Sequence, residues 1–215
     1  SSFESLRNQF AAGLNMGIAG IPWWTTDIGG FHGGNPSDPA FREVLVRWFE
    51  YGAFCPVMRL HGDREPHKAP MSDVRGGRCA SGADKEVWSY GDEAYEICKK
   101  YMFLRERMRP YTEQLMREAH EKGSPVIRPL FYGFPEDKKA WEVEDQYLYG
   151  ADILVAPILY AEQRERRVYL PEGVNWTEVW TGKGYEGGQT ITVDAPIDQI
   201  PLFVKDSALL EVLNP

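Results

Sequence analysis

The sequence predicts an α/β part followed by an all-β part, and two observations carry this prediction. From the first residue to about Leu60, helix-like and strand-like segments alternate, which is the rhythm of a parallel α/β fold. Beyond Ser124 the pattern changes to short strand-like runs separated by Gly, Pro, Asp and Asn, which favours an antiparallel sandwich. We therefore place a domain boundary near Gly123 and divide the chain into residues 1–123 and 124–215.

The α/β part begins with a helix. Ser1 and Glu4 form a capping-box pattern, in which the hydroxyl and the carboxylate satisfy free backbone donors of the first turn. Apolar residues then recur at helical spacing, and Gly17 and Gly20 end the helix. The next segment, residues 21–26, is a short aromatic and β-branched run, which predicts a buried strand.

A second helix and a second strand follow. Asp38 caps the helix and Pro39 lies in its first turn, while Gly52 ends it. Residues 54–60 form another short apolar run, which predicts the second strand. A loop rich in glycine or polar residues follows each predicted strand, at the end where parallel α/β folds carry their chemistry.

The remainder of the chain completes the two parts. Asp92 caps a third helix, Pro110 breaks or kinks it, and a further helical segment ends at Gly123. The predicted strands of the all-β part are Val126–Tyr132, Ile153–Leu159, Arg167–Leu170, Trp176–Trp180, Thr190–Val193 and Leu202–Val204.

Composition excludes several classes of function. The 215 residues include 24 Lys and Arg against 32 Asp and Glu, a net charge of −8, which argues against a nucleic acid partner. No apolar run approaches the roughly 20 residues of a membrane helix, so no membrane span is expected. Aromatic residues make up 13% of the chain, which suits sugar binding and equally suits a buried aromatic core. Three widely spaced cysteines slightly favour a reducing compartment such as the cytoplasm and leave the compartment open.

Four side chains are candidates for a binding site. Asp27 and Phe31 follow the first predicted strand, and Arg59 and His61 follow the second. If both strands belong to one parallel sheet, these residues face a common pocket that suits a polyhydroxylated ligand. The ring would pack on a sugar face and the polar groups would bind its hydroxyls. Two other interpretations stay open at this point: Asp27 caps a turn, or His61 is a loop histidine whose hydrogen bonds are satisfied locally.

Motifs along the whole chain carry a family resemblance. They are Trp24–Phe31, Arg47-Trp48, Arg59–Gly62, Arg109–Tyr111, Arg128–Leu130, Asp145–Tyr147, Leu154–Pro157, Tyr169–Gly173, Trp180–Gly182 and Pro201–Val204. In these motifs and their order the chain resembles glycoside hydrolase family 31, which contains α-glucosidases, α-xylosidases and related retaining α-glycosidases.

The resemblance implies an architecture and roles for the four candidates. Residues 1–123 would hold the last two βα units of a (β/α)8 TIM barrel, and residues 124–215 would be the proximal β-sandwich domain. In the family, the histidine of the Arg-x-His motif binds sugar hydroxyls in the −1 subsite, and the Phe of the Asp-Ile-Gly-Gly-Phe motif lines that subsite. By resemblance these substrate-binding residues are His61 and Phe31, with Asp27 and Arg59 in supporting roles.

One departure from the family pattern limits what the chain can do alone. Retaining members use two aspartates, a nucleophile after the fourth barrel strand and a general acid/base after the sixth, and neither motif is present here. We therefore expect no catalytic residue in this chain. The leading hypothesis is a fragment of a retaining α-glycosidase that hydrolyses terminal α-linked glucosyl or xylosyl residues of oligosaccharides or glycosides.

That hypothesis carries expectations about partners. The fragment would need the missing N-terminal part of the same polypeptide, would be inactive alone, and could self-associate through unpaired barrel edges. No organic cofactor or metal is implied, because glycoside hydrolysis needs only carboxylates and water. The alternative is a non-catalytic carbohydrate-binding or structural module on the same fold, and the two catalytic motifs upstream of this chain would distinguish them.

Overall fold

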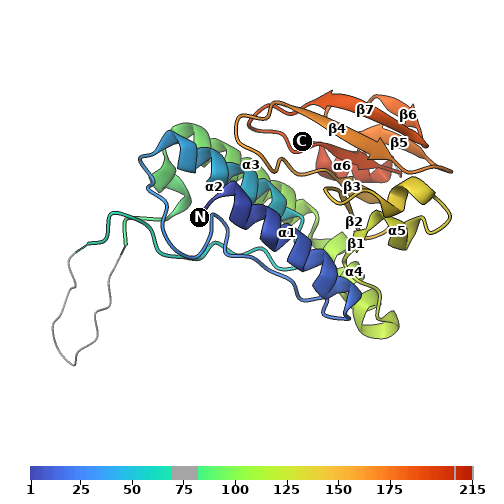
Figure 1. Ribbon diagram of the computed structural model, residues 1–215, viewed down its shortest axis with the longest axis horizontal. Helices are drawn as coiled ribbons and strands as arrows, with labels where there is room; N and C mark the ends of the chain where they lie inside the picture. The colour runs from blue at the N-terminus through green and yellow to red at the C-terminus, as the bar shows by residue number, and fades with distance from the viewer. Residues whose placement is uncertain (69–81, 206, 215) are drawn as a thin grey trace.

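The computed structural model describes residues 1–68, 82–205 and 207–214. Long helices lie on one side of the molecule and the strands on the other (Figure 1). The helices of this first side are α1 Phe3–Ile18, α2 Pro39–Ala53, α3 Asp92–Arg107 and α4 Arg109–Lys122, with the short 3-10 helix η2 Val87–Tyr90 before α3. The helices predicted from periodicity are therefore confirmed, including the break close to Pro110.

The helix ends differ from the predictions at two places. Ser2, and not Ser1, is the N-cap of α1, since its side chain accepts a hydrogen bond from the Ser5 amide. The Ser1 hydroxyl instead donates to the carbonyl of His32 at 2.6 Å, so it ties the chain start to the glycine-rich loop. Gly91, and not Asp92, is the N-cap of α3. The capping prediction for α2 is confirmed, because the Asp38 side chain accepts from the Ala40 amide at 3.0 Å.

Replacing Asp38 with Ala should destabilise the chain by about 1 kcal/mol, because the cap satisfies an amide that no residue of α2 can bond. Chemical denaturation followed by circular dichroism measures this loss. Asp38→Asn keeps a side-chain acceptor and should change the stability by only a few tenths of a kcal/mol. Ser37→Ala, one residue earlier, is the matched control. Equal effects of Asp38→Ala and Ser37→Ala would contradict the capping role.

The second half of the chain consists mainly of antiparallel strands. A six-stranded sheet has the order β1-β2-β3-β8-β5-β6, and a second sheet pairs β4 with β7. The strands are β1 Ile127–Pro129, β2 Tyr147–Tyr149, β3 Ile153–Val155, β4 Glu165–Leu170, β5 Asn175–Glu178, β6 Gly184–Glu186, β7 Gln189–Asp194 and β8 Leu202–Val204. The short helices of this half are α5 Leu130–Gly133, η3 Lys138–Trp141 and α6 Ala208–Leu213. All six predicted runs contain a strand, and β2 and β6 were not predicted.

The two strands predicted in the α/β part are wrong. The structure assigns no strand to residues 21–26 or 54–60 and describes both as irregular. The segments nevertheless lie next to each other, since the Val57 amide donates to the Trp24 carbonyl at 3.1 Å. A strand requires a continuous ladder of backbone hydrogen bonds, and isolated bonds between two short segments do not supply one. The apolar runs therefore place the segments correctly but do not form a sheet within the described residues.

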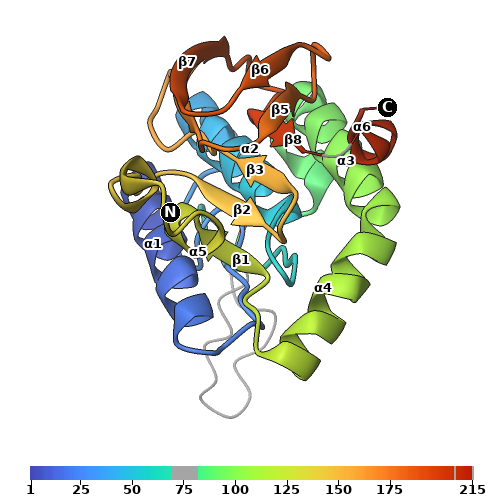
Figure 2. The ribbon, with the colours of Figure 1, turned by 90° about the vertical axis from the view of Figure 1, so that its right-hand side faces the viewer.

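Two hydrophobic clusters hold the fold together. In β3, Ile153 and Val155 pack with the helices in the first cluster, while Leu154 packs with β4 and β7 in the second. This alternation follows from the two-residue period of a strand, so the part of the sheet formed by β1, β2, β3 and β8 is buried on both faces, while β6 at its edge is not. Figure 2 shows the sheet strands in front of α2 and beside α3 and α4. Both halves of the chain thus contribute to one shared core.

A buried arginine also joins the two halves. Arg47 of α2 is fully buried, and its Nη1 donates to Oε2 of the equally buried Glu50 at 3.0 Å. Its two terminal nitrogens also donate to backbone carbonyls of the second half, those of Gln163, Ala195, Pro196 and Gln199, at 2.7–3.2 Å. One guanidinium thereby fixes two loops of the strand-rich half against α2.

Candidate functional site

The loops that follow the two irregular segments meet in space. The Ile28 amide donates to the Arg59 carbonyl at 3.2 Å, and the Asp63 amide donates to the Phe31 carbonyl at 2.7 Å. The sequence predicted this meeting from the rule that the carboxyl ends of neighbouring parallel strands share one edge. The meeting persists without assigned strands, because these backbone bonds join the two segments directly.

Phe31 and His61 lie together at a cavity. Their ring centroids are 5.5 Å apart, and Phe31 is 48% exposed. Both residues line a cavity of about 490 Å³, together with His32, Gly62, Asp63 and residues 82–86. The His61 ring makes no hydrogen bond to any residue in the described part of the chain, so no partner there satisfies it locally. An apolar ring beside a free imidazole suits a ligand with both an apolar face and hydroxyl groups.

Asp27 and Arg59 form an ion pair outside the lining of that cavity. The Asp27 side chain is 19% exposed and the Arg59 side chain is 50% exposed, so the pair is partly shielded from water. The turn after Asp27 is closed by its backbone, because the Gly30 amide donates to the Asp27 carbonyl at 2.7 Å. The carboxylate thus serves the ion pair and does not cap the turn. The pair holds the ends of the two segments together, beside the Phe31 and His61 cavity.

Sequence reasoning missed two cationic residues next to this cavity. Arg64 is fully buried and donates to carbonyls of the loop that carries Phe31. Lys85 lines the cavity, and its ammonium donates to the Gly62 carbonyl. Both residues belong to a polar segment whose composition is typical of a solvent-exposed loop. Residues 69–81 of that segment lie outside the described residues. The density of glycines around them was the available signal, because glycine permits close approach to a backbone.

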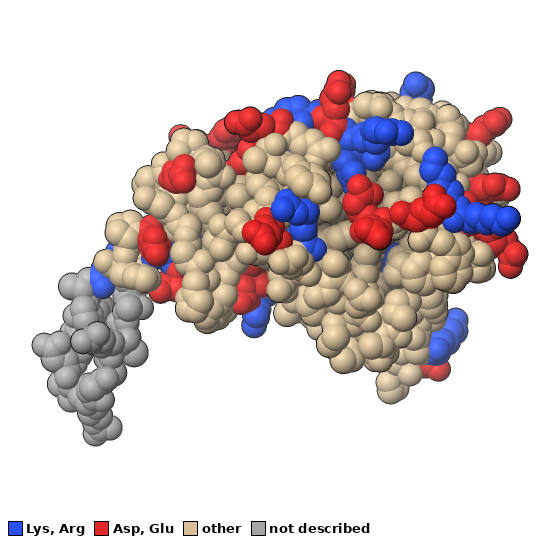
Figure 3. Space-filling view, in the orientation of Figure 1, with Lys and Arg blue, Asp and Glu red and all other residues tan. Residues whose placement is uncertain are grey.

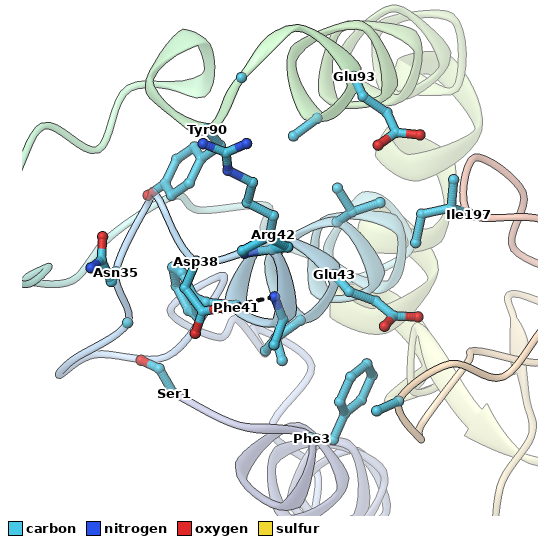
Figure 4. A pocket seen from close by; sticks show the side chains of 18 of the residues that line it. Ser1, Phe3, Asn35, Asp38, Phe41, Arg42, Glu43, Tyr90, Glu93 and Ile197 are labelled. Carbon is cyan, nitrogen blue, oxygen red and sulfur yellow. Dashed lines mark hydrogen bonds between the residues drawn. The ribbon is translucent and has the colours of Figure 1, made fainter.

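A larger hollow lies elsewhere, beside α2 and between α1 and α3 (Figure 4). It measures about 930 Å³, and helix surfaces line it together with the loop residues Gly34, Asn35, Ala161, Glu162 and Ile197. Two of its charged groups are already engaged: Arg42 donates to the Pro36 carbonyl at 2.6 Å, and Glu43 pairs with Arg164. Gly34, Asn35 and Glu65 of the two loops reach its wall, but Phe31 and His61 do not. We therefore take the smaller cavity at Phe31 and His61 as the candidate site.

Acidic and basic side chains are interspersed on the face drawn in Figure 3, with no continuous basic stripe. In the part of the chain that the structure describes, no group of three or more His, Cys, Asp or Glu residues is placed to hold a metal ion. No helix among the described residues has the length and apolarity needed to cross a membrane.

Two family models match consecutive parts of the chain. Residues 1–115 match the model described as the glycosyl hydrolases family 31 TIM-barrel domain. Residues 123–210 match the model described as the glycosyl hydrolase family 31 C-terminal domain.

Individual relatives cover nearly the whole chain. An α-xylosidase of Saccharolobus solfataricus is 38% identical over 99% of this chain, and α-glucosidase 2 of Bacillus thermoamyloliquefaciens is 35% identical over 98%. Among solved structures, a family 31 α-xylosidase from a soil metagenome, complexed with xylose, is 54% identical over the full chain with a TM-score of 0.95. The chain spans 26%, 24% and 32% of the lengths of these three proteins, respectively.

Proposed function

Because this chain belongs to glycosyl hydrolase family 31, we propose that it is the C-terminal part of a retaining α-glycosidase that removes terminal α-linked xylosyl or glucosyl residues. In this proposal residues 1–123 supply the last two βα units of a (β/α)8 barrel, and residues 124–215 form the sandwich domain that follows it. The lengths support it, since the chain spans about a quarter to a third of its similar proteins.

The observation that carries the proposal is the pairing of Phe31 with His61 at one cavity. The Phe31 ring would pack against the C–H face of a sugar, and the His61 ring would hydrogen-bond its hydroxyl groups. Asp27 and Arg59 would support this subsite by holding the two segment ends together. The α-xylosidases at 54% and 38% identity make an α-xyloside the first substrate to test, with an α-glucoside second.

The chain's own residues would supply binding, and the bond cleavage would come from elsewhere in the polypeptide. Retaining hydrolysis needs one carboxylate to attack the anomeric carbon and another to move the proton. The sequence of this chain contains neither family motif, so we assign both carboxylates to another part of the polypeptide. Hydrogen bonds to the substrate hydroxyls strengthen as the oxocarbenium-like transition state forms, so a binding residue such as His61 still contributes to the rate.

Replacing His61 with Ala should lower kcat/KM at least about tenfold, because one lost hydrogen bond of about 1.4 kcal/mol corresponds to that factor. The test uses a chimera in which this chain replaces the matching 32% of the soil-metagenome α-xylosidase. Aryl α-xyloside hydrolysis is then measured with and without the substitution. His120→Ala, on the exposed face of α4, is the control.

Each outcome of this experiment separates the candidate functions. Unchanged kinetics in the His61→Ala chimera would remove His61 from the subsite. A folded chimera that binds xylose without hydrolysing xylosides would instead favour the non-catalytic carbohydrate-binding module. We expect an active chimera. Its His61→Ala variant should have a lower kcat/KM, and its His120→Ala variant should keep the kcat/KM of the unsubstituted chimera.

A further inference from the structure

Arg64 lies directly beneath the loop that carries Phe31. It is fully buried, and its Nη1 donates to the Gly30 carbonyl at 2.8 Å and to the Gly33 carbonyl at 3.3 Å. Nη2 donates to the Ile28 carbonyl at 3.0 Å, and Nε donates to the Tyr90 hydroxyl at 3.2 Å. The three carbonyls come from one short loop, so a single side chain fixes the backbone on both sides of Phe31.

No carboxylate among the described residues forms an ion pair with Arg64, and an aromatic ring and backbone carbonyls lie around its charge instead. Its guanidinium carbon lies 5.2 Å from the centre of the Phe41 ring, and the loop carbonyls provide the negative ends of their dipoles. Burying a charge is costly unless its hydrogen bonds are satisfied, so this arrangement is stable only while the loop keeps its shape. The planar fork of a guanidinium can hold several carbonyls in fixed directions, which the single ammonium of lysine cannot do.

Two glycines lie against the guanidinium, and a side chain at either position would clash with it. A Cβ added to Gly29 would lie 2.8 Å from Nη2 of Arg64, and one added to Gly62 would lie 2.9 Å from its Nη1. Both glycines also have positive φ angles, +84° and +127°, which other residues rarely adopt. Gly29 and Gly62 therefore leave the room that the guanidinium occupies, whereas a Cβ at Gly30 or Gly34 would meet Ser1 or Phe41 instead.

We propose that Arg64 is the positioning residue of the Phe31 and His61 site, and that its hydrogen bonds to the loop carbonyls set how the two rings face each other. The inference rests on the proposed function, because it gives the pair its role in sugar binding. Phe31 is about half exposed, and its ring neighbours are His32 and His61. The ring is thus held through its backbone, which Arg64 fixes, and not by burial in the core.

The first test measures the geometry of the ring pair in the 215-residue chain. The Phe31 ring shifts the NMR signals of the His61 ring protons, and Phe31→Ala defines the signal without that ring. Arg64→Met should move the His61 signals most of the way to the Phe31→Ala value. Arg105→Met is the matched control, because Arg105 also donates to two backbone carbonyls, those of Ala53 and Pro56, but away from this loop. His61 signals that stay unchanged in folded Arg64→Met would overturn the proposal.

Arg64→Lys is a second variant, used in case Arg64→Met fails to fold. It keeps the positive charge and much of the volume, and signals of β4 and β7 report whether the fold persists. We expect Arg64→Lys to shift the His61 signals in the same direction as Arg64→Met, because one ammonium cannot hold three carbonyls. Full retention of the wild-type His61 signals by Arg64→Lys would show that charge alone suffices and would overturn the positioning role.

The second test asks whether Arg64 acts through Phe31. In the xylosidase chimera, Arg64→Met should lower kcat/KM at least tenfold, while in a Phe31→Ala background it should cost less than about threefold. Non-additivity of this kind is expected when two residues act as one unit. If the kcat/KM losses of Arg64→Met and Phe31→Ala multiply fully in the double variant, the inference is contradicted. An unsubstituted chimera without activity would instead refute the proposed function, and the His61 signals would still decide the role of Arg64.

Discussion

The 215-residue chain by itself is expected to release no p-nitrophenol from aryl α-xylosides or α-glucosides. The two carboxylates that retaining hydrolysis needs have no matching motif between Ser1 and Pro215. A subsite that only binds a sugar leaves the uncatalysed barrier largely in place, because binding without transition-state chemistry does not raise the rate of the chemical step. The expected effect is therefore complete loss of activity relative to the chimera, measured with equal amounts of both proteins.

Association should accompany this inactivity. Trp23, Ile21 and Val57 belong to the two irregular segments and are 68%, 44% and 37% exposed, which is unusual for apolar residues in runs that predict buried strands. Exposed apolar surface of this kind favours self-association, so light scattering should report species larger than a monomer. Robust aryl xyloside turnover by a verified monomer would contradict the assignment of the chemistry to residues outside this chain.

The sequence predicted helices better than strands, and the reason is physical. A helix closes its hydrogen bonds within itself, so the periodicity and the cap at Asp38 were sufficient. A strand depends on partners elsewhere, so the apolar runs at residues 21–26 and 54–60 were predicted as strands although the structure pairs them too sparsely. β2 and β6 have three residues each and, unlike β1 and β3, do not lie within a longer apolar run, because polar residues or glycines flank them on both sides.

The candidate site was predicted in part. The rule about strand ends brought Asp27, Phe31, Arg59 and His61 into one region, and the structure places them there as a ring pair and an ion pair. Arg64 could not be recognised, because an arginine in a polar stretch predicts a solvated side chain. The glycines around it allow a close approach, but a sequence does not show that backbone carbonyls surround a buried guanidinium there.

The second large effect is expected at the buried pair of Arg47 and Glu50. Arg47→Met should destabilise the chain by about 3–5 kcal/mol at pH 8, because it leaves a buried carboxylate without its partner and frees four backbone carbonyls. Urea denaturation followed by circular dichroism measures the change. The double variant Arg47→Met/Glu50→Gln should recover part of the loss, because it removes the unpaired charge and keeps the volume.

The pH dependence distinguishes this mechanism from simple loss of packing. Burial raises the pKa of Glu50 to about 7, while Arg47 opposes the rise. The folded state therefore holds a proton more tightly than the unfolded state, and the stability that Glu50 contributes is complete below its ordinary pKa of 4.5 and is lost as the pH rises through about 7. Without Arg47 the pKa should rise further, so Arg47→Met should be less destabilising at pH 5 than at pH 8. The Glu50→Gln double variant should lose this difference, and an equal loss at both pH values in Arg47→Met would show that packing and the four carbonyls, and not the buried charge, dominate.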